Sequence, residues 1–125
     1  MKLKSLLLLS CLCFLPASFA GNIHFNPQIT ETEKQSIANQ LGAPGPCQIE
    51  IINNSSYDLM VYGRFDNDVY LIPFLMKYWG AAQYVSLYYN NFCHLGMDFY
   101  IETTDGKVKY NGYTPVGKTI NIKNW

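Results

Sequence analysis

An alternation of apolar and polar residues that starts at Cys93 is the feature that most limits what this chain can fold into. Every second residue is apolar, and the residues in between are mostly polar. Successive side chains on a strand point to opposite faces, so the pattern predicts a strand with one buried and one wetter face. A shorter copy of the pattern covers 47–51. The residues predicted to face inward are Cys93, Leu95, Met97, Phe99 and Ile101 in the first stretch and Cys47, Ile49 and Ile51 in the second.

The two cysteines that lead these stretches predict a disulfide. Cys47 and Cys93 remain after removal of a leader that contains Cys11 and Cys13, and an even pair in an exported chain is expected to be oxidised. The chain-entropy model assigns a bridge across about 46 residues roughly 4 kcal/mol of stability. That is a sizeable share of the net stability of a small domain, which is about 5–15 kcal/mol.

Residues 1–20 are typical of a secretory signal peptide. Lys2 and Lys4 give a positive start, an apolar run follows, and small residues allow cleavage after Ala20. The apolar run is too short to span a bilayer. Cleavage before Cys11, as in bacterial lipoproteins, is the alternative. The residue two positions before a lipoprotein cysteine is usually small, whereas here it is Leu9. We therefore expect an exported protein of the periplasm or the medium, without a transmembrane segment in the mature chain.

The start of the mature chain differs in character from the rest. Thr30 and Glu33 have the spacing of a capping box, which predicts a short helix that runs to Leu41 and is buried through Ile37 and Leu41. A stiff Pro/Gly linker follows at 42–46. The expected division is a signal peptide at 1–20, an N-terminal arm with this helix and linker at 21–46, and a β-sandwich domain at 47–125.

After the linker, nearly every segment has the pattern of a strand. About seven short strands with regularly spaced turns favour a single immunoglobulin-like β-sandwich, in an all-β fold with a short N-terminal helix and one disulfide. A small closed β-barrel is the alternative. The predicted strands are 47–53, 58–65, 69–74, 83–89, 93–103, 107–113 and 119–123.

Asp105-Gly106 predicts a two-residue type I′ hairpin turn. That turn would set Phe99 opposite Gly112, Ile101 opposite Tyr110 and Thr103 opposite Val108, all facing inward. Glu102 would then oppose Lys109 in an exposed ion pair worth about 0.2–1 kcal/mol.

The apolar connection at 74–82 lacks strand alternation and has two interpretations. It crosses between the sheets and plugs the open end of the core, or it is a surface loop that contacts a partner or a membrane interface. In the second case Tyr78 and Trp79 are the first binding candidates.

Ten tyrosines are many for so small a domain. Flat amphipathic rings suit contacts with sugars or proteins, although high β-propensity and cover by the arm would also account for them. Strand parity places Tyr62, Tyr84, Tyr88, Tyr100 and Tyr113 on outward faces. The binding residues we predict are Tyr78 and Trp79, then Tyr88 and Tyr100.

Charge and spacing argue against several other kinds of site. Without Lys2 and Lys4 the chain has seven basic and nine acidic residues, a net charge near −2 that offers no footprint for nucleic acid. His24 and His94 lack the paired spacing of a zinc site. The stretch 66–68 offers oxygen ligands for calcium but has the composition of a turn. We expect no metal and no cofactor.

Catalytic residues are not evident either. His94 and Asp98 share a strand face but stand about 13 Å apart, too far for a catalytic triad. We expect a non-enzymatic exported protein that binds a protein or carbohydrate ligand through exposed aromatic side chains. An inhibitor of a secreted hydrolase, such as a lysozyme or protease, is the alternative. A small hydrolase with a polar cluster of His94, Asp98 and Ser86 is the second alternative.

Overall fold

The computed structural model describes residues 23–38 and 47–125. The predicted signal peptide at 1–20, the linker at 42–46, the helix end at Leu41 and the side chain of Ile37 lie outside what is described. No helix among the described residues is long and apolar enough to cross a membrane. In chain order the elements are β1 (Ile23–His24), α2 (Glu31–Ala38), β2 (Gln48–Asn53), β3 (Leu59–Phe65), β4 (Phe74–Met76), β5 (Gln83–Ser86), β6 (Tyr88–Tyr89), β7 (Phe92–Cys93), β8 (Gly96–Thr103), β9 (Val108–Pro115) and β10 (Thr119–Ile122).

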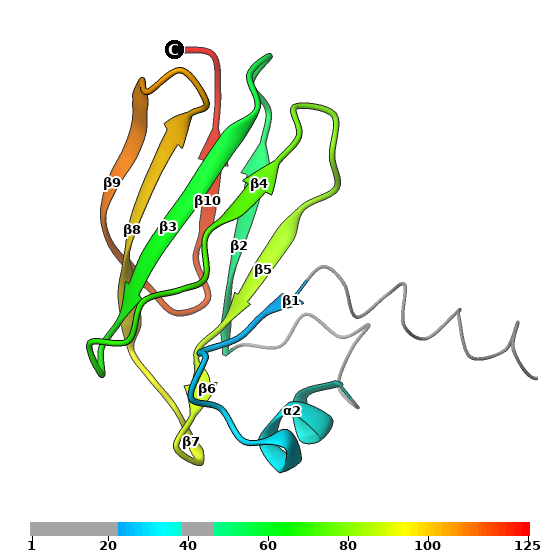
Figure 1. Ribbon diagram of the computed structural model, residues 1–125, viewed down its shortest axis with the longest axis vertical. Coiled ribbons are helices and arrows are strands. Elements are labelled where there is room, and N and C mark those ends of the chain that lie inside the picture. The colour runs from blue at the N-terminus through cyan, green and yellow to red at the C-terminus, as the bar shows by residue number, and fades with distance from the viewer. Residues whose placement is uncertain (1–22, 39–46) are drawn as a thin grey trace, which may run out of the picture.

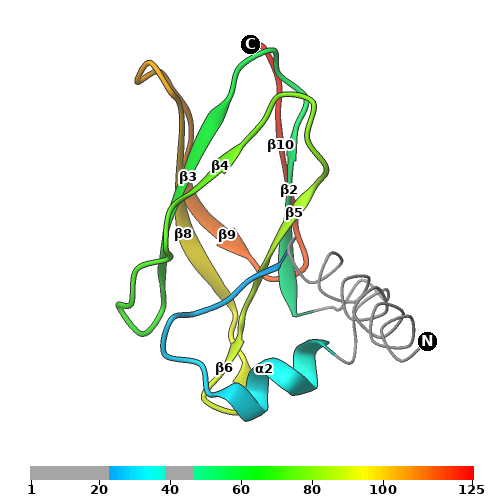
Figure 2. The same cartoon turned by 45° about the vertical axis from the view of Figure 1, so that its right-hand side comes forward.

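Two four-stranded sheets face each other (Figures 1 and 2). The first has the order β1-β5-β2-β10, with an antiparallel β2–β5 pair at its centre and a parallel pair on each side. The second, β4-β3-β8-β9, is antiparallel throughout. The hairpin β6–β7 lies at one end with α2. The sheets are open at their edges, which confirms a β-sandwich rather than a closed barrel; the immunoglobulin-like connectivity stays a prediction.

Alternate residues of the strands fill the space between the sheets. Ile49 and Ile51 on β2 are fully buried, as are Met97, Phe99 and Ile101 on β8. This confirms the inward face predicted for those positions. Burial of each such side chain contributes about 1.5–3 kcal/mol. The rest of the core is formed by Leu59, Val61, Phe65, Leu71, Met76, Val85, Leu87, Tyr89, Ile120 and Ile122.

The predicted strand at 93–103 is interrupted, and the prediction for its first residues is wrong. β7 ends at Cys93 and β8 begins at Gly96, and Leu95 between them is 79% exposed. The backbone N–H of His94 donates to the carbonyl of Leu87 at 3.0 Å, which directs this segment into the β6–β7 hairpin instead of the sheet. Cys93 is therefore exposed and does not face the core.

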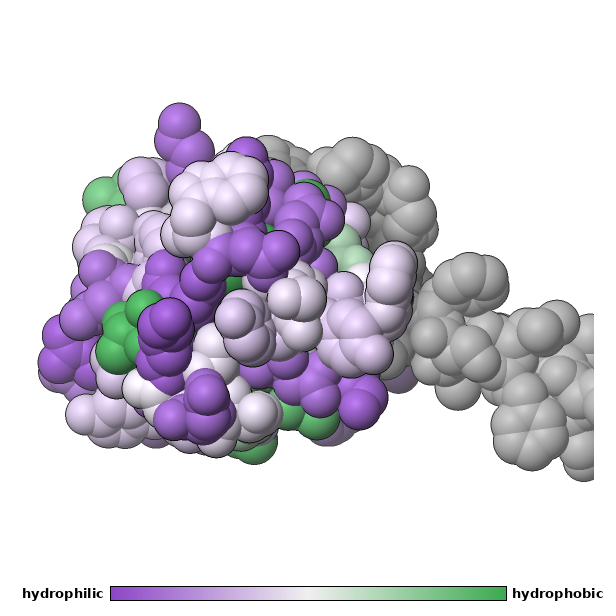
Figure 3. All heavy atoms as spheres, turned by 90° about the horizontal axis from the view of Figure 1, so that it is seen from above, coloured by the Kyte–Doolittle hydropathy of each residue, from purple (hydrophilic) through white to green (hydrophobic). Residues whose placement is uncertain are grey.

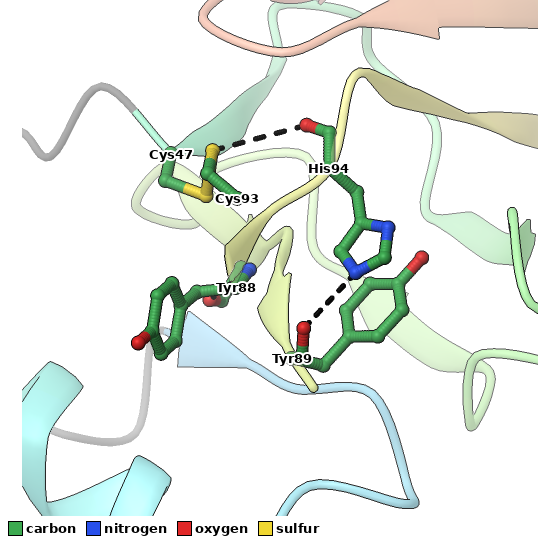
Figure 4. The surroundings of a disulfide bond; sticks show 6 residues. Cys47, Tyr88, Tyr89, Cys93 and His94 are labelled. Atoms are coloured by element: carbon green, nitrogen blue, oxygen red, sulfur yellow. Dashed lines mark hydrogen bonds between the residues drawn. A yellow bond between two sulfur atoms is a disulfide. The ribbon is translucent and has the colours of Figure 1, made fainter. Parts of the chain in front are cut away.

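The predicted disulfide is nevertheless confirmed (Figure 4). Cys47 precedes β2 and packs against the core, and its Cα lies 5.7 Å from that of Cys93 at the end of β7. The bridge thus fastens the β6–β7 hairpin to the first sheet. Tyr88, which pairs with Cys93 in that hairpin, lies beside it.

The predicted β8–β9 register is correct in the middle of the hairpin and wrong at its turn. Phe99 opposes Gly112 and Ile101 opposes Tyr110 as predicted, but a bulge then sets Glu102 opposite Val108. Val108 is consequently exposed instead of inward.

The turn itself is not of type I′, because only Gly106 has a positive φ, 96°. The Thr103 hydroxyl accepts the backbone N–H of Lys107 at 2.9 Å, which favours a longer turn with a bulge. The predicted Glu102–Lys109 ion pair is absent from the described residues, and the Lys109 ammonium donates to the Asn124 carbonyl at 3.0 Å instead. Both central residues have positive φ in the Asn90-Asn91 turn between β6 and β7, at 54° and 66°.

The predicted strand at 69–74 is displaced along the chain. Phe74–Met76 forms a continuous ladder with β3, whereas Tyr70 makes only an isolated bridge with Arg64 of β3. Pro73 lacks the N–H that a continuous ladder would need, which explains the break between the two pairings.

The capping box is confirmed. The Glu33 carboxylate accepts the Thr30 N–H, and the Thr30 hydroxyl accepts the Glu33 N–H, both at 3.1 Å. The second Glu33 oxygen accepts the N–H of Asn91 at 2.6 Å, so one side chain joins α2 to the β6–β7 hairpin. The amides of Thr30 and Asn91 lower the pKa of Glu33. This contribution to stability is present at neutral pH and is lost as the pH falls through the lowered pKa.

An aromatic stack closes one side of the sandwich. His24 on β1 lies parallel to Phe74 on β4 with 3.6 Å between ring centroids, and its Nε2 is 2.8 Å from Gln83 Oε1. β1 and β4 are edge strands of different sheets. The stack therefore joins the edges of the two sheets, where 23–38 and 47–125 provide no further strand.

Gly96 and Gly112 provide a matched test of the β8–β9 packing. A Cβ on Gly96 would lie 2.5 Å from the Thr114 carbonyl oxygen, whereas a Cβ on Gly112 would meet nothing within 4 Å. We expect Gly96→Ala to cost about 1–3 kcal/mol of unfolding free energy, since backbone must move. Gly112→Ala should change it by no more than about 0.5 kcal/mol. Urea denaturation measures both, and equal effects would contradict this packing.

A second prediction concerns acid and the His24–Phe74 stack. Burial lowers the pKa of His24, and the hydrogen bond with Gln83 opposes this only in part. The unfolded chain, with a histidine pKa of about 6.5, therefore takes up the proton first, and stability falls as the pH drops below about 7. His24→Phe keeps a stacked ring without the titration. Its melting temperature should change less than that of the wild type between about pH 7 and 5.5; parallel curves would refute the assignment.

Candidate binding surface at the loop end

The four predicted binding residues lie in three separate places. Tyr78 and Trp79 follow β4 at one end of the sandwich, with ring centroids 5.8 Å apart. Tyr100 lies on the outer face of the second sheet beside its cross-strand partner Tyr62, at 6.1 Å. Tyr88 is on the hairpin at the opposite end. The structure thus joins the first two candidates and separates them from the others.

The connection at 74–82 has features of both predicted interpretations, a plug of the core and an exposed loop. Met76 is buried in the core and Phe74 packs against it, as the plug requires. Tyr78 and Trp79 are exposed, as the surface loop requires.

Three loops and the final residues meet at the end of the sandwich where Tyr78 and Trp79 lie. The strand register requires this, because Leu59, at the start of β3, pairs with both Met76 and Thr103, and Asn53 pairs with Ile122. We call this surface the loop end and define it by residues 54–58, 77–82, 104–109 and 123–125.

Asn53 holds two parts of the loop end together from beneath. Its side chain is buried, and its Nδ2 donates to the carbonyls of Tyr57 at 2.8 Å and Met76 at 3.3 Å. Its Oδ1 accepts the N–H and the hydroxyl of Ser55 at 3.0 and 2.6 Å. One amide therefore fixes the start of the loop at 77–82 against the loop at 54–58.

Two further polar residues complete the network. The Asp58 carboxylate accepts the N–H of Tyr78 at 3.2 Å and lies 3.5 Å from the Lys77 ammonium. The backbone carbonyl of Asp58 accepts the N–H of Thr104 at 3.2 Å. The Asn124 side chain accepts the N–H of Ser56 at 2.7 Å. Every segment of the loop end is thereby hydrogen-bonded to another.

The loop end exposes four large aromatic side chains. Trp125 is 91% exposed, Trp79 85%, Tyr78 44% and Tyr57 42%. Trp79 and Trp125 are the only tryptophans in the chain. Figure 3 views the molecule from this end, which shows hydrophilic purple and pale residues with small separate green spots. Tyrosine and tryptophan fall in the pale part of that scale, although each presents a large apolar ring.

Sequence reasoning missed Tyr57 and Trp125 as site residues. Each is isolated in the sequence, one in a turn and one at the last position. The signal that would have found them is topological: the turn after the first strand and the end of the last strand lie together only if these strands run parallel, as β2 and β10 do.

The other outward tyrosines have mostly structural contacts. Tyr84 and Tyr62 are half-buried, and the Tyr84 hydroxyl donates to Glu50 at 3.2 Å. The Tyr113 hydroxyl donates to Asp66 at 3.0 Å. Burial and the acceptor Asp66 raise the pKa of Tyr113, so it stays protonated at neutral pH.

The residues considered for catalysis or calcium binding are engaged elsewhere. His94 stacks on Tyr89 at 3.7 Å and donates from Nε2 to its carbonyl, while Asp98 pairs with Arg64 at 2.9 Å on the second sheet. Ser86 is buried on the first sheet. The stretch 66–68 forms the turn after β3, and no group of three or more His, Cys, Asp or Glu in 23–38 and 47–125 is arranged to hold a metal ion.

Comparison of the chain with family models, with curated proteins and with solved structures found no match.

The buried amide of Asn53 gives a prediction with a matched neighbour as control. Asn53→Asp replaces both donors with acceptors that face two carbonyls, so we expect a loss of about 1–3 kcal/mol in unfolding free energy. Protease cleavage within 54–58 should become faster. Asn54→Asp is the control, because Asn54 is exposed and its one partner, Asn121, is an amide that can turn its donor toward the new carboxylate. An equal loss of unfolding free energy in both variants would show that the Asn53 amide does not hold the two loops together.

Proposed function

We propose that this chain is an exported, non-enzymatic binding protein and that the loop end contacts its ligand. The observation that carries the proposal is the joint exposure of Trp79, Trp125, Tyr78 and Tyr57 on loops fixed by hydrogen bonds. Large exposed apolar rings lose contact with water on binding and supply much of the affinity of a binding surface.

The rigidity of the loop end supports the same proposal. Binding orders side chains and loops at a cost in entropy, and a surface held in place beforehand avoids much of that cost. The disulfide at Cys47–Cys93 and the sandwich core provide the frame. The disulfide also supports the proposed export, since such bonds persist in oxidising compartments. The proposed ligand is a protein or a carbohydrate of the periplasm or the medium.

Inhibition of a secreted hydrolase is the second candidate function. The short turn that carries Trp79 is fixed at its base by the Tyr78–Asp58 hydrogen bond and closed by one from Gly80 N–H to the Lys77 carbonyl at 3.0 Å. A protruding rigid turn suits insertion into an active site. Loss of lysozyme or protease activity on addition of the protein would distinguish this candidate from a carbohydrate-binding function.

Intrinsic tryptophan fluorescence tests the proposed function. Both tryptophans are at the loop end, so ligand binding there should shift their emission to shorter wavelength. Titrations with envelope glycan fractions and with a panel of lysozymes and proteases should give such a shift. Trp79→Ala should weaken binding by about 2 kcal/mol or more, as expected for a central aromatic residue. Tyr70→Ala, which removes an exposed ring far from the loop end, should leave binding unchanged; the reverse result would place the site elsewhere.

A further inference from the structure

The charges of the described residues are divided unevenly between the loop end and the rest. Side chains of the loop end carry four positive and two negative charges, a net charge of +2. The remaining described side chains carry three positive and seven negative charges, a net charge of −4. The loop-end residues are Lys77, Lys107, Lys109, Lys123, Asp58 and Asp105, and the other basic residues are Lys34, Arg64 and Lys118.

The two acids of the loop end are already engaged. Asp58 binds Lys77 and the Tyr78 N–H, and Asp105 accepts the hydroxyl of Thr103. The ammonium groups next to the rings are not neutralised by a side-chain carboxylate: Lys109 lies 5.9 Å above the Tyr57 ring and Lys123 5.7 Å above the Trp125 ring. The charged side chains that an anion meets over these two rings are therefore ammonium groups.

The polar character of the loop end favours a sugar over a lipid bilayer as its ligand. Its only aliphatic side chains are those of Ala81, Ala82 and Val108, and all other positions are amides, hydroxyls, charged groups, aromatic rings or glycine. Entry into a bilayer would remove those polar groups from water without replacing their hydrogen bonds. A sugar ring has an apolar C–H face for an indole and hydroxyls at its rim for amides such as Asn54.

We infer that the loop end binds an anionic polysaccharide, one that carries carboxylate or sulfate groups, through Trp79 and Trp125 on its sugar faces and Lys109 and Lys123 on its charges. This inference rests on the proposed function and narrows its ligand. The net negative charge of the remaining surface repels such polymers, so attachment is directed to the loop end.

Dextran sulfate and neutral dextran of equal length are the probes, with tryptophan emission as the readout. We expect dextran sulfate to bind about tenfold more tightly, and about 1 M salt, where the Debye length is about 3 Å, to remove the difference. The double variant Lys109→Ser/Lys123→Ser should lose about five- to tenfold in affinity for dextran sulfate, as expected for two exposed ion pairs. Lys34→Ser/Lys118→Ser, with the same change in charge elsewhere, should bind as the wild type does.

Each contrary result has a distinct meaning. Equal binding of dextran and dextran sulfate would overturn the anionic preference and leave the proposed binding function intact. Binding to vesicles of one part phosphatidylglycerol and three parts phosphatidylcholine, with none to dextran sulfate, would assign the loop end to a membrane surface instead. If Lys34→Ser/Lys118→Ser weakens dextran sulfate binding as much as the loop-end double variant does, the polymer is held by non-specific electrostatic attraction and not by a site at the loop end, and the inference is overturned. The variant Trp79→Ala/Trp125→Ala has no tryptophan left, so its binding to dextran sulfate is measured by titration calorimetry. Binding that persists in this variant as in the wild type would overturn both proposals.

Discussion

Packing of the two sheets through alternate residues is the constraint on which the rest of the structure depends. Because side chains on a strand alternate with a period of two, burial of Ile49 and Ile51 on β2 and of Phe99 and Ile101 on β8 decides what every intervening position shows to water. The same packing sets where each strand ends. The loops that carry the exposed rings are therefore positioned by the core, even though none of those rings is part of it.

The outline of this fold follows from the sequence because alternation and oxidation are local or pairwise signals. The inward face of 97–101, the capping box of Thr30 and Glu33 and the Cys47–Cys93 bridge each rest on such a signal. The failures arise where long-range contacts override local pattern. Leu95 has the parity of a core residue, but the hydrogen bond between His94 and Leu87 removes its segment from the sheet.

Only half of the exposed aromatic residues of the candidate site could be predicted from the sequence. Tyr78 and Trp79 stand out in the sequence because their segment is apolar but lacks strand alternation. Tyr57 and Trp125 become part of the surface only through the parallel pairing of β2 and β10, a contact between strands far apart in the sequence. Asn53 likewise has the appearance of an ordinary residue at the end of a predicted strand, and its role depends on two carbonyls that only the folded chain brings to it.

The stack of His24 on Phe74 also has a consequence for self-association. Among the described residues, the two-residue strand β1 is all that pairs with the outer edge of β5, and β4 is only three residues long. If the imidazole leaves the phenyl ring, two adjacent ladders of backbone N–H and C=O groups become open to pairing with another molecule. The side of the sandwich that this stack seals is thus where strand exchange or fibre-like growth would begin, at the flank rather than at the loops.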